Sequence, residues 1–273
     1  MAAPRVYSLL IPAVGGQGGG VLSEWIVEAA TAEGHAVSST SIPGVAQRTG
    51  STSYYVEVVT GDDRDAAVAS LYPVPGAVDV LLAPEFLEVG RAIEQGFPSP
   101  ERTTIVASTH RLYSIHEKTA TGRGIYPREQ LEEAARAFAR RLVAFDGLAL
   151  AREHGTEVNA ILLGALAASG ALPIRHEAYT HAIEVKGVAV AANLRGFEAG
   201  IGFVEGTMPP PAPAVARALR TPPQFADAVA HFPEGLRPTV GEALARLIDY
   251  QDEKYAALYL ERLAPFVRPD IEP

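Results

Sequence analysis

The first third of the chain alternates between short apolar runs and amphipathic stretches. Residues 6–14 form a nearly continuous apolar run, which is typical of a strand buried on both faces of a parallel sheet. The glycine-rich segment GGQGGG (15–20) follows directly, and apolar side chains then recur at helical spacing until Gly34. Residues 36–42 and 51–59 predict two further strands, the second rich in β-branched and aromatic side chains. This order predicts an α/β fold.

The alternation continues to about residue 203. We expect strands at residues 78–83, 103–108 and 142–145, and helices at residues 85–95, 127–140, 147–153, 158–169, 175–186 and 188–203. Asp146 is well placed to cap the third of these helices. Alternating strands and helices favour a mostly parallel sheet with helices on both faces. The predicted fold class is therefore a Rossmann-like α/β domain, followed by a helical C-terminal extension.

A change in composition after residue 205 indicates a boundary. The segment MPPPAP (208–213) is stiff and lacks most amide donors, as linkers do. We expect an α/β domain over residues 1–205, a Pro-rich linker over 206–222 and a helical extension over 223–273. In the extension, helical spacing is followed by Leu244, Leu247, Ile248, Gln251, Tyr255 and Leu258. This spacing predicts one amphipathic helix with no core of its own, which must dock on the main domain, on a partner or on sequence that is missing here.

Composition and charge exclude several classes of protein. The chain has 23 basic and 32 acidic residues, a formal charge of −9, which argues against binding to nucleic acid. It has no cysteine, and its seven histidines show no metal-ligand spacing, so no zinc site, iron–sulfur cluster or cysteine nucleophile is expected. No apolar run reaches the roughly 20 residues of a membrane helix, and no signal peptide is recognisable. We expect a cytoplasmic protein.

The glycine turn is a candidate anion site. Backbone N–H groups at the start of a helix suit a phosphate or carboxylate. The dinucleotide fingerprint is incomplete, however, because Ala13 replaces its first glycine and residues 38–41 (SSTS) offer no acid for a ribose. No Lys-Ser or Lys-Thr follows, so the Walker pattern also fails. The turn therefore predicts either an anion or nucleotide-tail site, or simply a tight turn that lets the helix pack closely on the sheet.

A second loop, residues 43–50 (PGVAQRTG), is expected to open at the same end of the sheet, where α/β sheets place ligands. Arg48 can form paired hydrogen bonds to a phosphate or carboxylate, and Gln47 can orient the same group. The alternative is a structural arginine that bridges loop carbonyls or lies at a subunit interface.

Other polar residues are expected to have structural roles. Asn159 and Asn193 fall in helical stretches that disfavour asparagine, which indicates a buried hydrogen-bonding role, more often backbone capping than catalysis. Glu85 and Glu88 begin a helix, where acids complement the helix dipole. Residues 108–110 (STH) look like part of a catalytic triad, but no Gly-x-Ser-x-Gly motif accompanies them, so a hydrolase is disfavoured.

Two separated motifs carry a family resemblance. GGQG (15–18) opening a helix and GVAQRTGS (44–51) leading into a strand resemble the gamma domain of the 2-oxoacid:ferredoxin oxidoreductases, and within that family the β subunit of the indolepyruvate oxidoreductases. TEVNAILLGAL (156–166) and VAANLRGFEAG (190–200) extend the likeness to about residue 203. Thr49 departs from the family, whose loops often have glycine there.

The resemblance implies a subunit that works with a catalytic partner. In this family the partner holds thiamine diphosphate and iron–sulfur clusters, and the complex oxidatively decarboxylates an aryl pyruvate to an aryl-acetyl-CoA. Electrons pass to ferredoxin or another acceptor. The gamma domain packs against the thiamine-binding domains and helps to position the substrate coenzyme A. For this chain the resemblance implies no cofactor, metal or catalytic residue of its own.

The resemblance and the loop chemistry together give one set of candidate cofactor-binding residues. These are Gly15, Gly16, Gln17, Gly18, Gly44, Gln47, Arg48, Gly50 and Ser51. Longer relatives continue past a linker of this kind, so the end at Pro273 predicts a shortened form or a fragment. The alternatives are a stand-alone nucleotide-binding enzyme and a purely structural assembly module.

Overall fold

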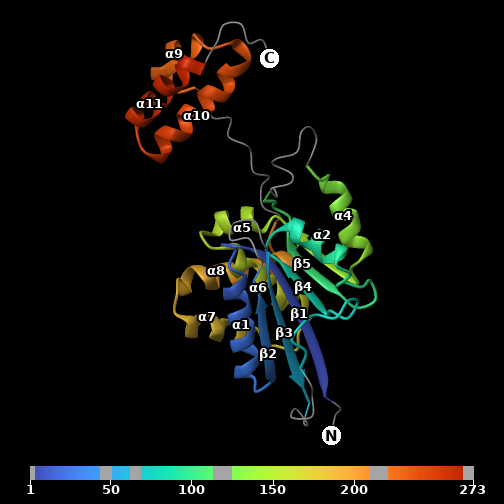
Figure 1. Cartoon of the computed structure of the whole chain (residues 1–273). Coiled ribbons are helices and arrows are strands. Elements are labelled where there is room, and N and C mark those ends of the chain that lie inside the picture. Colours follow the sequence, from blue (N-terminus) through green and yellow to red (C-terminus); the bar gives the residue numbers. More distant parts are fainter. Residues whose placement is uncertain (1–3, 44–50, 62–68, 113–124, 210–220, 267–273) are drawn as a thin grey trace. The chain divides into compact units, whose positions relative to one another are not determined.

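The protein folds as two units. The computed structural model (Figure 1) describes residues 4–43, 51–61, 69–112, 125–209 and 221–266. Contacts within the chain separate Met1–Pro213 from Ala214–Pro273. The first is an α/β domain and the second is helical. No helix in the described segments is both long and apolar enough to cross a membrane.

A single six-stranded sheet forms the centre of the α/β domain. Its strands are β1 (Arg5–Val14), β2 (Ala36–Ile42), β3 (Ser51–Thr60), β4 (Val80–Ala83), β5 (Thr104–Ser108) and β6 (Arg141–Phe145). Their order across the sheet is β2-β3-β1-β4-β5-β6. Strands β1, β4, β5 and β6 are parallel neighbours, whereas β3 runs antiparallel to both β1 and β2. The mostly parallel sheet is therefore confirmed, with β3 as the one reversed strand among the described residues.

Helices cover both faces of the sheet (Figure 1). On one face lie α1 (Gly19–Ala32), α5 (Gly147–His154), α6 (Val158–Ser169), α7 (His176–Lys186) and α8 (Val190–Val204). On the other face lie α2 (Phe86–Glu94) and α4 (Arg128–Ala137). Because side chains alternate along a strand, Leu9 and Ile11 of β1 enter the first core while Leu10 enters the second. The continuous apolar runs of the sequence thus reflect burial on both faces.

Two helical glycines let α6 and α8 cross closely. A Cβ atom on Gly164 would overlap the carbonyl oxygen of Phe197, and one on Gly200 would overlap the carbonyl oxygen of Ile161. Each glycine therefore packs against the backbone of the opposite helix. This crossing stacks α8 on α6, and α6 in turn lies next to the sheet.

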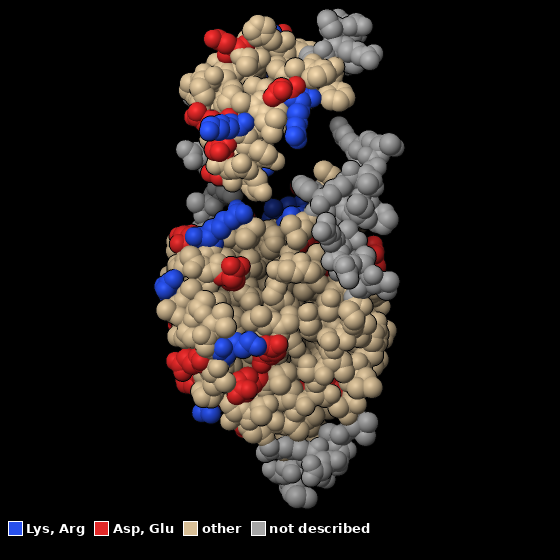
Figure 2. Space-filling view, turned by 60° about the vertical axis from the view of Figure 1, so that its left-hand side comes forward, with Lys and Arg blue, Asp and Glu red and all other residues tan. Residues whose placement is uncertain are grey.

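Capping residues and ion pairs fix individual helices. Asp146 accepts a hydrogen bond from the backbone N of Ala149 at 2.9 Å, which confirms it as the cap of α5. Helix α7 is tied to α1 at its beginning, where Arg175 Nε lies 2.7 Å from Glu33 Oε1. Figure 2 shows acidic and basic side chains next to one another on the face that it draws.

The C-terminal unit corrects one expectation. The periodicity predicted a single helix over residues 244–258 with no core, but the chain forms α9 (Ala226–Ala230), α10 (Arg237–Tyr250) and α11 (Glu253–Leu263). Backbone angles leave the helical region at Gln251, and Asp252 caps the next helix by accepting from the backbone N of Tyr255 at 2.8 Å. The chain therefore folds back on itself. The three helices and their connections bury a small core of their own, formed by Val229, Phe232, Val240, Leu244 and Ala256.

Candidate functional site

The turn between β1 and α1 is built from residues 15–18. Gly16 and Gly18 have φ angles of +88° and +71°, which side chains other than glycine rarely adopt. Gln17 closes the turn, because its backbone N donates to the carbonyl of Val14 at 3.2 Å and its side-chain Oε1 accepts from the backbone N of Val14 at 3.1 Å. The Gln17 side chain therefore holds the turn against the end of the strand.

A pocket of about 500 Å³ lies over this turn, at the carboxyl edge of the parallel strands. It is lined by Gly16, Gln17, Gly18, Pro84, His110, Leu112, Leu148, Glu157, Val158 and Asn159. Three helices (α1, α5 and α6) begin within one residue of a lining residue. First-turn amides have no acceptor within their own helix, and the helix dipole makes this end positive. The pocket therefore suits a ligand with an anionic group and an apolar portion.

Asn159 packs directly against the glycine turn. It is 8% exposed, and a Cβ atom on Gly18 would lie 2.7 Å from its Nδ2. Its Oδ1 accepts from the backbone N of Ala160 at 3.0 Å, while Asn193 Nδ2 donates to the carbonyl of Val188 at 2.9 Å. Buried hydrogen bonding by both asparagines is confirmed. The contact between Asn159 and Gly18 was not predictable from the sequence, because the two residues lie far apart along it.

His110 presents a neutral imidazole to the pocket. Burial lowers its pKa, with a smaller opposing influence from Asp146. The Ser108 hydroxyl accepts from the backbone N of Gly147 at 3.0 Å and lies 2.7 Å from His110 Nδ1. In the tautomer in which that hydroxyl donates to Nδ1, the ring proton lies on Nε2, which is then a hydrogen-bond donor. Ser108 is fully buried and anchors α5, which is unlike an exposed nucleophile.

Glu85 holds one of the residues that line the pocket. It caps α2 by accepting from the backbone N of Glu88 at 3.2 Å, and it accepts from the backbone N of Leu112, a lining residue, at 2.9 Å. The role at the start of a helix is confirmed, but the sequence did not reveal the burial. Glu85 is fully buried, and this burial raises the pKa of its carboxyl group to about 7.

The raised pKa of Glu85 predicts a pH-dependent stability. The folded protein holds this proton up to about pH 7, whereas the unfolded chain releases it near its ordinary value of 4.5. Its stabilising contribution is therefore present below the unfolded pKa and is lost as the pH rises through the folded one. From pH 5.5 to pH 8 we expect the free energy of unfolding of the wild type to fall by about 2 kcal/mol more than that of Glu85→Gln.

Denaturant titrations at several pH values measure this difference. Glu129→Gln, at an exposed acid on α4, is the control and should follow the wild-type profile. Parallel profiles for the wild type and Glu85→Gln would contradict the assignment.

Of the five candidate residues between positions 44 and 51, the structure describes only Ser51. Gly44, Gln47, Arg48 and Gly50 lie outside the described residues. Ser51 pairs with Val14 at the end of the β1–β3 ladder, so the chain enters β3 at the edge of the sheet where the glycine turn begins.

Ser51 does not line the glycine-turn pocket but a smaller cavity of about 150 Å³ beside Glu88 and Arg91. Glu88 is 1% exposed, and neither of its carboxylate oxygens accepts a hydrogen bond from a described residue. Its charge is offset by Arg91, whose Nη2 lies 3.5 Å away. Gly16, Gln17 and Gly18 are therefore the candidates that share one pocket in the described structure, with Gly15 next to them in the turn.

The fold and this pocket define a Rossmann-like α/β domain with an anion-compatible pocket at its first turn. The family model of pyruvate ferredoxin/flavodoxin oxidoreductase matches residues 8–203. The chain belongs to this family and is a subunit of the 2-oxoacid:ferredoxin oxidoreductase type.

Named relatives agree with this assignment. The indolepyruvate oxidoreductase subunit IorB of Pyrococcus horikoshii is 30% identical over 206 residues, which is 72% of this chain and 95% of that protein. IorB of Thermococcus kodakarensis is 28% identical over 204 residues, with the same shares.

Two solved structures share the fold. Pyruvate oxidoreductase subunit PORC from Thermotoga maritima has a TM-score of 0.50 at 19% identity, over 72% of this chain and 96% of that one. A 2-oxoglutarate:ferredoxin oxidoreductase from Magnetococcus marinus, with 2-oxoglutarate, coenzyme A and succinyl-CoA bound, has a TM-score of 0.52 at 17% identity. That match covers 77% of this chain and 32% of that one.

Proposed function

We propose that this chain is the cluster-free subunit of a thiamine-diphosphate-dependent aryl-pyruvate:ferredoxin oxidoreductase, with indolepyruvate as its 2-oxoacid. The main support is the similarity to IorB of Pyrococcus horikoshii, which extends over 95% of the length of that protein. The complex would decarboxylate the 2-oxoacid, transfer the remaining acyl group to coenzyme A and pass two electrons to ferredoxin or another acceptor.

The side chains of this chain support the proposal that another subunit holds the redox groups. Iron–sulfur clusters are held mainly by cysteine thiolates, and the chain has no cysteine. In the described segments, no group of three or more His, Asp or Glu side chains could hold a metal ion. We therefore assign the clusters and thiamine diphosphate to the partner subunit. There, thiamine diphosphate supplies carbanion stabilisation for decarboxylation.

The glycine-turn pocket is our candidate for the coenzyme A contact. Its helix N-termini and the amides of Gly16 and Gly18 suit a phosphate group. Leu112, Leu148 and Val158 offer an apolar wall. His110 would donate a hydrogen bond from Nε2 while remaining neutral. The second loop, with Gln47 and Arg48, is proposed as a further contact to the same ligand.

We also propose a domain organisation, based on the change in composition after residue 205. Residues 1–205 form the family domain, 206–222 a linker and 223–273 a helical extension. We propose that the α/β domain docks on the thiamine-binding partner and that the complex is cytoplasmic.

Co-production of the full chain with the partner subunit tests the proposal. The complex should contain iron and thiamine diphosphate and should reduce an acceptor dye with indolepyruvate or phenylpyruvate plus coenzyme A. The chain produced alone should do neither, because it has no redox group.

Two outcomes would favour the alternatives. Oxidation of a 2-oxoacid, or tight NAD binding, by the chain alone would favour a stand-alone nucleotide-binding enzyme. Loss of the complex on Arg48→Ala would favour a structural module, whereas an intact complex with a raised Michaelis constant for coenzyme A is the result that the proposal expects.

A further inference from the structure

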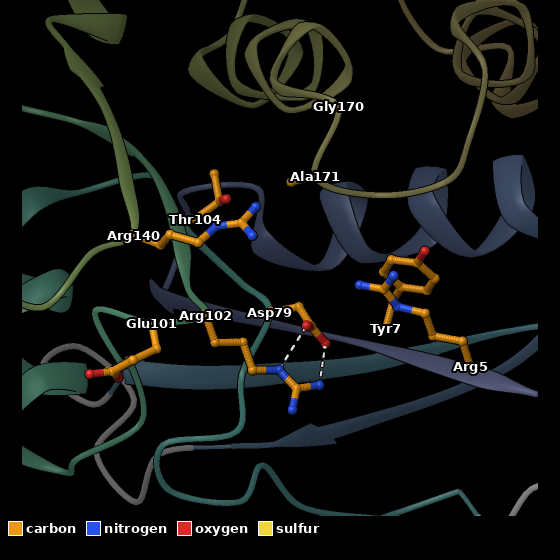
Figure 3. Close-up of a pocket in the computed structure, with 9 residues that line it drawn as sticks. All are labelled: Arg5, Tyr7, Asp79, Glu101, Arg102, Thr104, Arg140, Gly170 and Ala171. Carbon is orange, nitrogen blue, oxygen red and sulfur yellow. Dashed lines mark hydrogen bonds and ion pairs between the residues drawn. The ribbon is translucent and has the colours of Figure 1, made fainter.

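A second pocket of about 500 Å³ lies at the opposite edge of the sheet, where the parallel strands begin (Figure 3). Arg5 enters it from the start of β1, and Arg102 and Arg140 from the residues just before β5 and β6. In Figure 3, Arg140 and Arg5 extend into the pocket from opposite sides. The ability of the pocket to bind an anion depends on which of these three arginines already pair with an acid.

Arg102 is neutralised by Asp79. Its Nε lies 2.8 Å from Asp79 Oδ1 and its Nη2 lies 2.9 Å from Oδ2, and Ser8 donates to the same carboxylate from its backbone N and its hydroxyl. The other acid of the pocket, Glu101, points away from its centre in Figure 3 and accepts from the Ser99 hydroxyl at 2.5 Å. Neither acid pairs with Arg5 or Arg140, and the three arginines and two acids of the lining leave a net charge of +1.

Arg5 and Arg140 form no ion pair with a carboxylate in the described parts of the chain. The guanidinium of Arg5 lies 4.4 Å from the centre of the Tyr7 ring, which positions it without neutralising its charge. The carboxyl end of α6 would attract a cation, but the neighbouring Arg141 fills that role by donating from Nη1 to the carbonyl of Ser169 at 2.7 Å. Arg140 is thus available for a ligand.

We propose that this arginine pocket binds the phosphate group of a small phosphorylated molecule. Two guanidinium groups on opposite sides can each form paired hydrogen bonds to phosphate oxygens. The hydroxyl of Thr104, a residue only 3% exposed, faces the same space as Arg140 (Figure 3). A lining with three arginines and two acids is a local exception in a chain with a net charge of −9.

The size of the pocket indicates a ligand larger than phosphate itself. A volume of about 500 Å³ falls within the range of small-molecule sites, whereas one phosphate group would fill only part of it. The arginine pocket and the glycine-turn pocket lie at opposite edges of the sheet. This proposal therefore does not rest on the proposed oxidoreductase function.

Isothermal titration of the full chain with inorganic phosphate and with phenyl phosphate, at constant ionic strength, tests the arginine pocket. We expect phenyl phosphate to bind more tightly than inorganic phosphate. Arg5→Gln and Arg140→Gln should each weaken the binding of both by at least tenfold. Arg136→Gln removes the same charge from the exposed face of α4 and should leave the affinity unchanged.

The other outcomes each overturn the proposal. Equal weakening by Arg136→Gln would indicate a general charge effect. Loss of binding in Gly18→Val, with the arginine variants unaffected, would place the phosphate at the glycine turn. No binding of either probe at millimolar concentration, or binding of an acidic polypeptide in place of the probes, would exclude a phosphate site here.

Discussion

Gly164→Ala is expected to lower the free energy of unfolding of the α/β domain by about 3 kcal/mol, although it adds a single methyl group. At most helical positions this substitution is stabilising, because alanine restricts the unfolded chain more than glycine does. Here the new Cβ atom would overlap the carbonyl oxygen of Phe197, so α6 and α8 must move apart. Gly200→Ala should have a similar effect for the same reason. Because one separation relieves both clashes, the double variant should lose less than the sum.

Fluorescence of Trp25 provides the measurement. Trp25 is the sole tryptophan of the chain and is buried in α1, so a denaturant titration of the full chain reports on the α/β domain. Gly20→Ala is the matched control, because a Cβ atom there would come no closer than 3.4 Å to the Tyr54 hydroxyl. Its stability should stay the same or rise by up to about 1 kcal/mol. Wild-type stability in Gly164→Ala would contradict the close crossing.

Gly18→Val should reduce kcat/KM of the assembled complex by about 100-fold, mainly by raising the Michaelis constant for coenzyme A. At φ +71° valine is strained, and its Cβ atom would press on Asn159 while the rest of the side chain enters the pocket. A hundredfold loss corresponds to about 2.7 kcal/mol of transition-state stabilisation.

Gly206→Val separates this effect from backbone strain. Gly206 has a similar φ of +73°, no atom within 4 Å of a Cβ atom placed there, and no part in the pocket. It should lose stability but keep its Michaelis constant for coenzyme A. If Gly206→Val and Gly18→Val lower kcat/KM equally, the glycine-turn pocket does not bind this substrate.

The strands and the first turn were predictable because their signals are local. A doubly buried strand gives a continuous apolar run, and a turn with positive φ at Gly16 and Gly18 needs glycine. The direction of β3 was not predictable in the same way, since β-branched and aromatic side chains favour a strand without specifying parallel or antiparallel pairing. No proline or glycine marks the break at Gln251 in the sequence. The helical spacing of apolar residues continues across it and therefore predicted one helix.

The pocket was only partly predictable, because long-range packing assembles it. His110 follows a strand at the carboxyl edge, a position that could have marked it as a site residue. Glu85 gave no such signal, because an acid at the start of a helix looks the same in the sequence whether it is exposed or buried. Gly164 and Gly200 lie in helices, where glycine ordinarily lowers helix stability. Only the packing of α6 on α8 gives them a role.

The reversed strand β3 determines where insertions and deletions can be accommodated during evolution. Ten residues of β1 pair in unbroken register with residues 51–60. Removing one residue from within β3 would shift the following side chains to the opposite face of the sheet and take Val56 or Val58 out of the larger core. A change of length before Ser51 leaves the ladder intact. Aligned relatives should therefore show their gaps between β2 and Ser51, so the second loop can diverge in length while its point of attachment beside the glycine turn stays fixed.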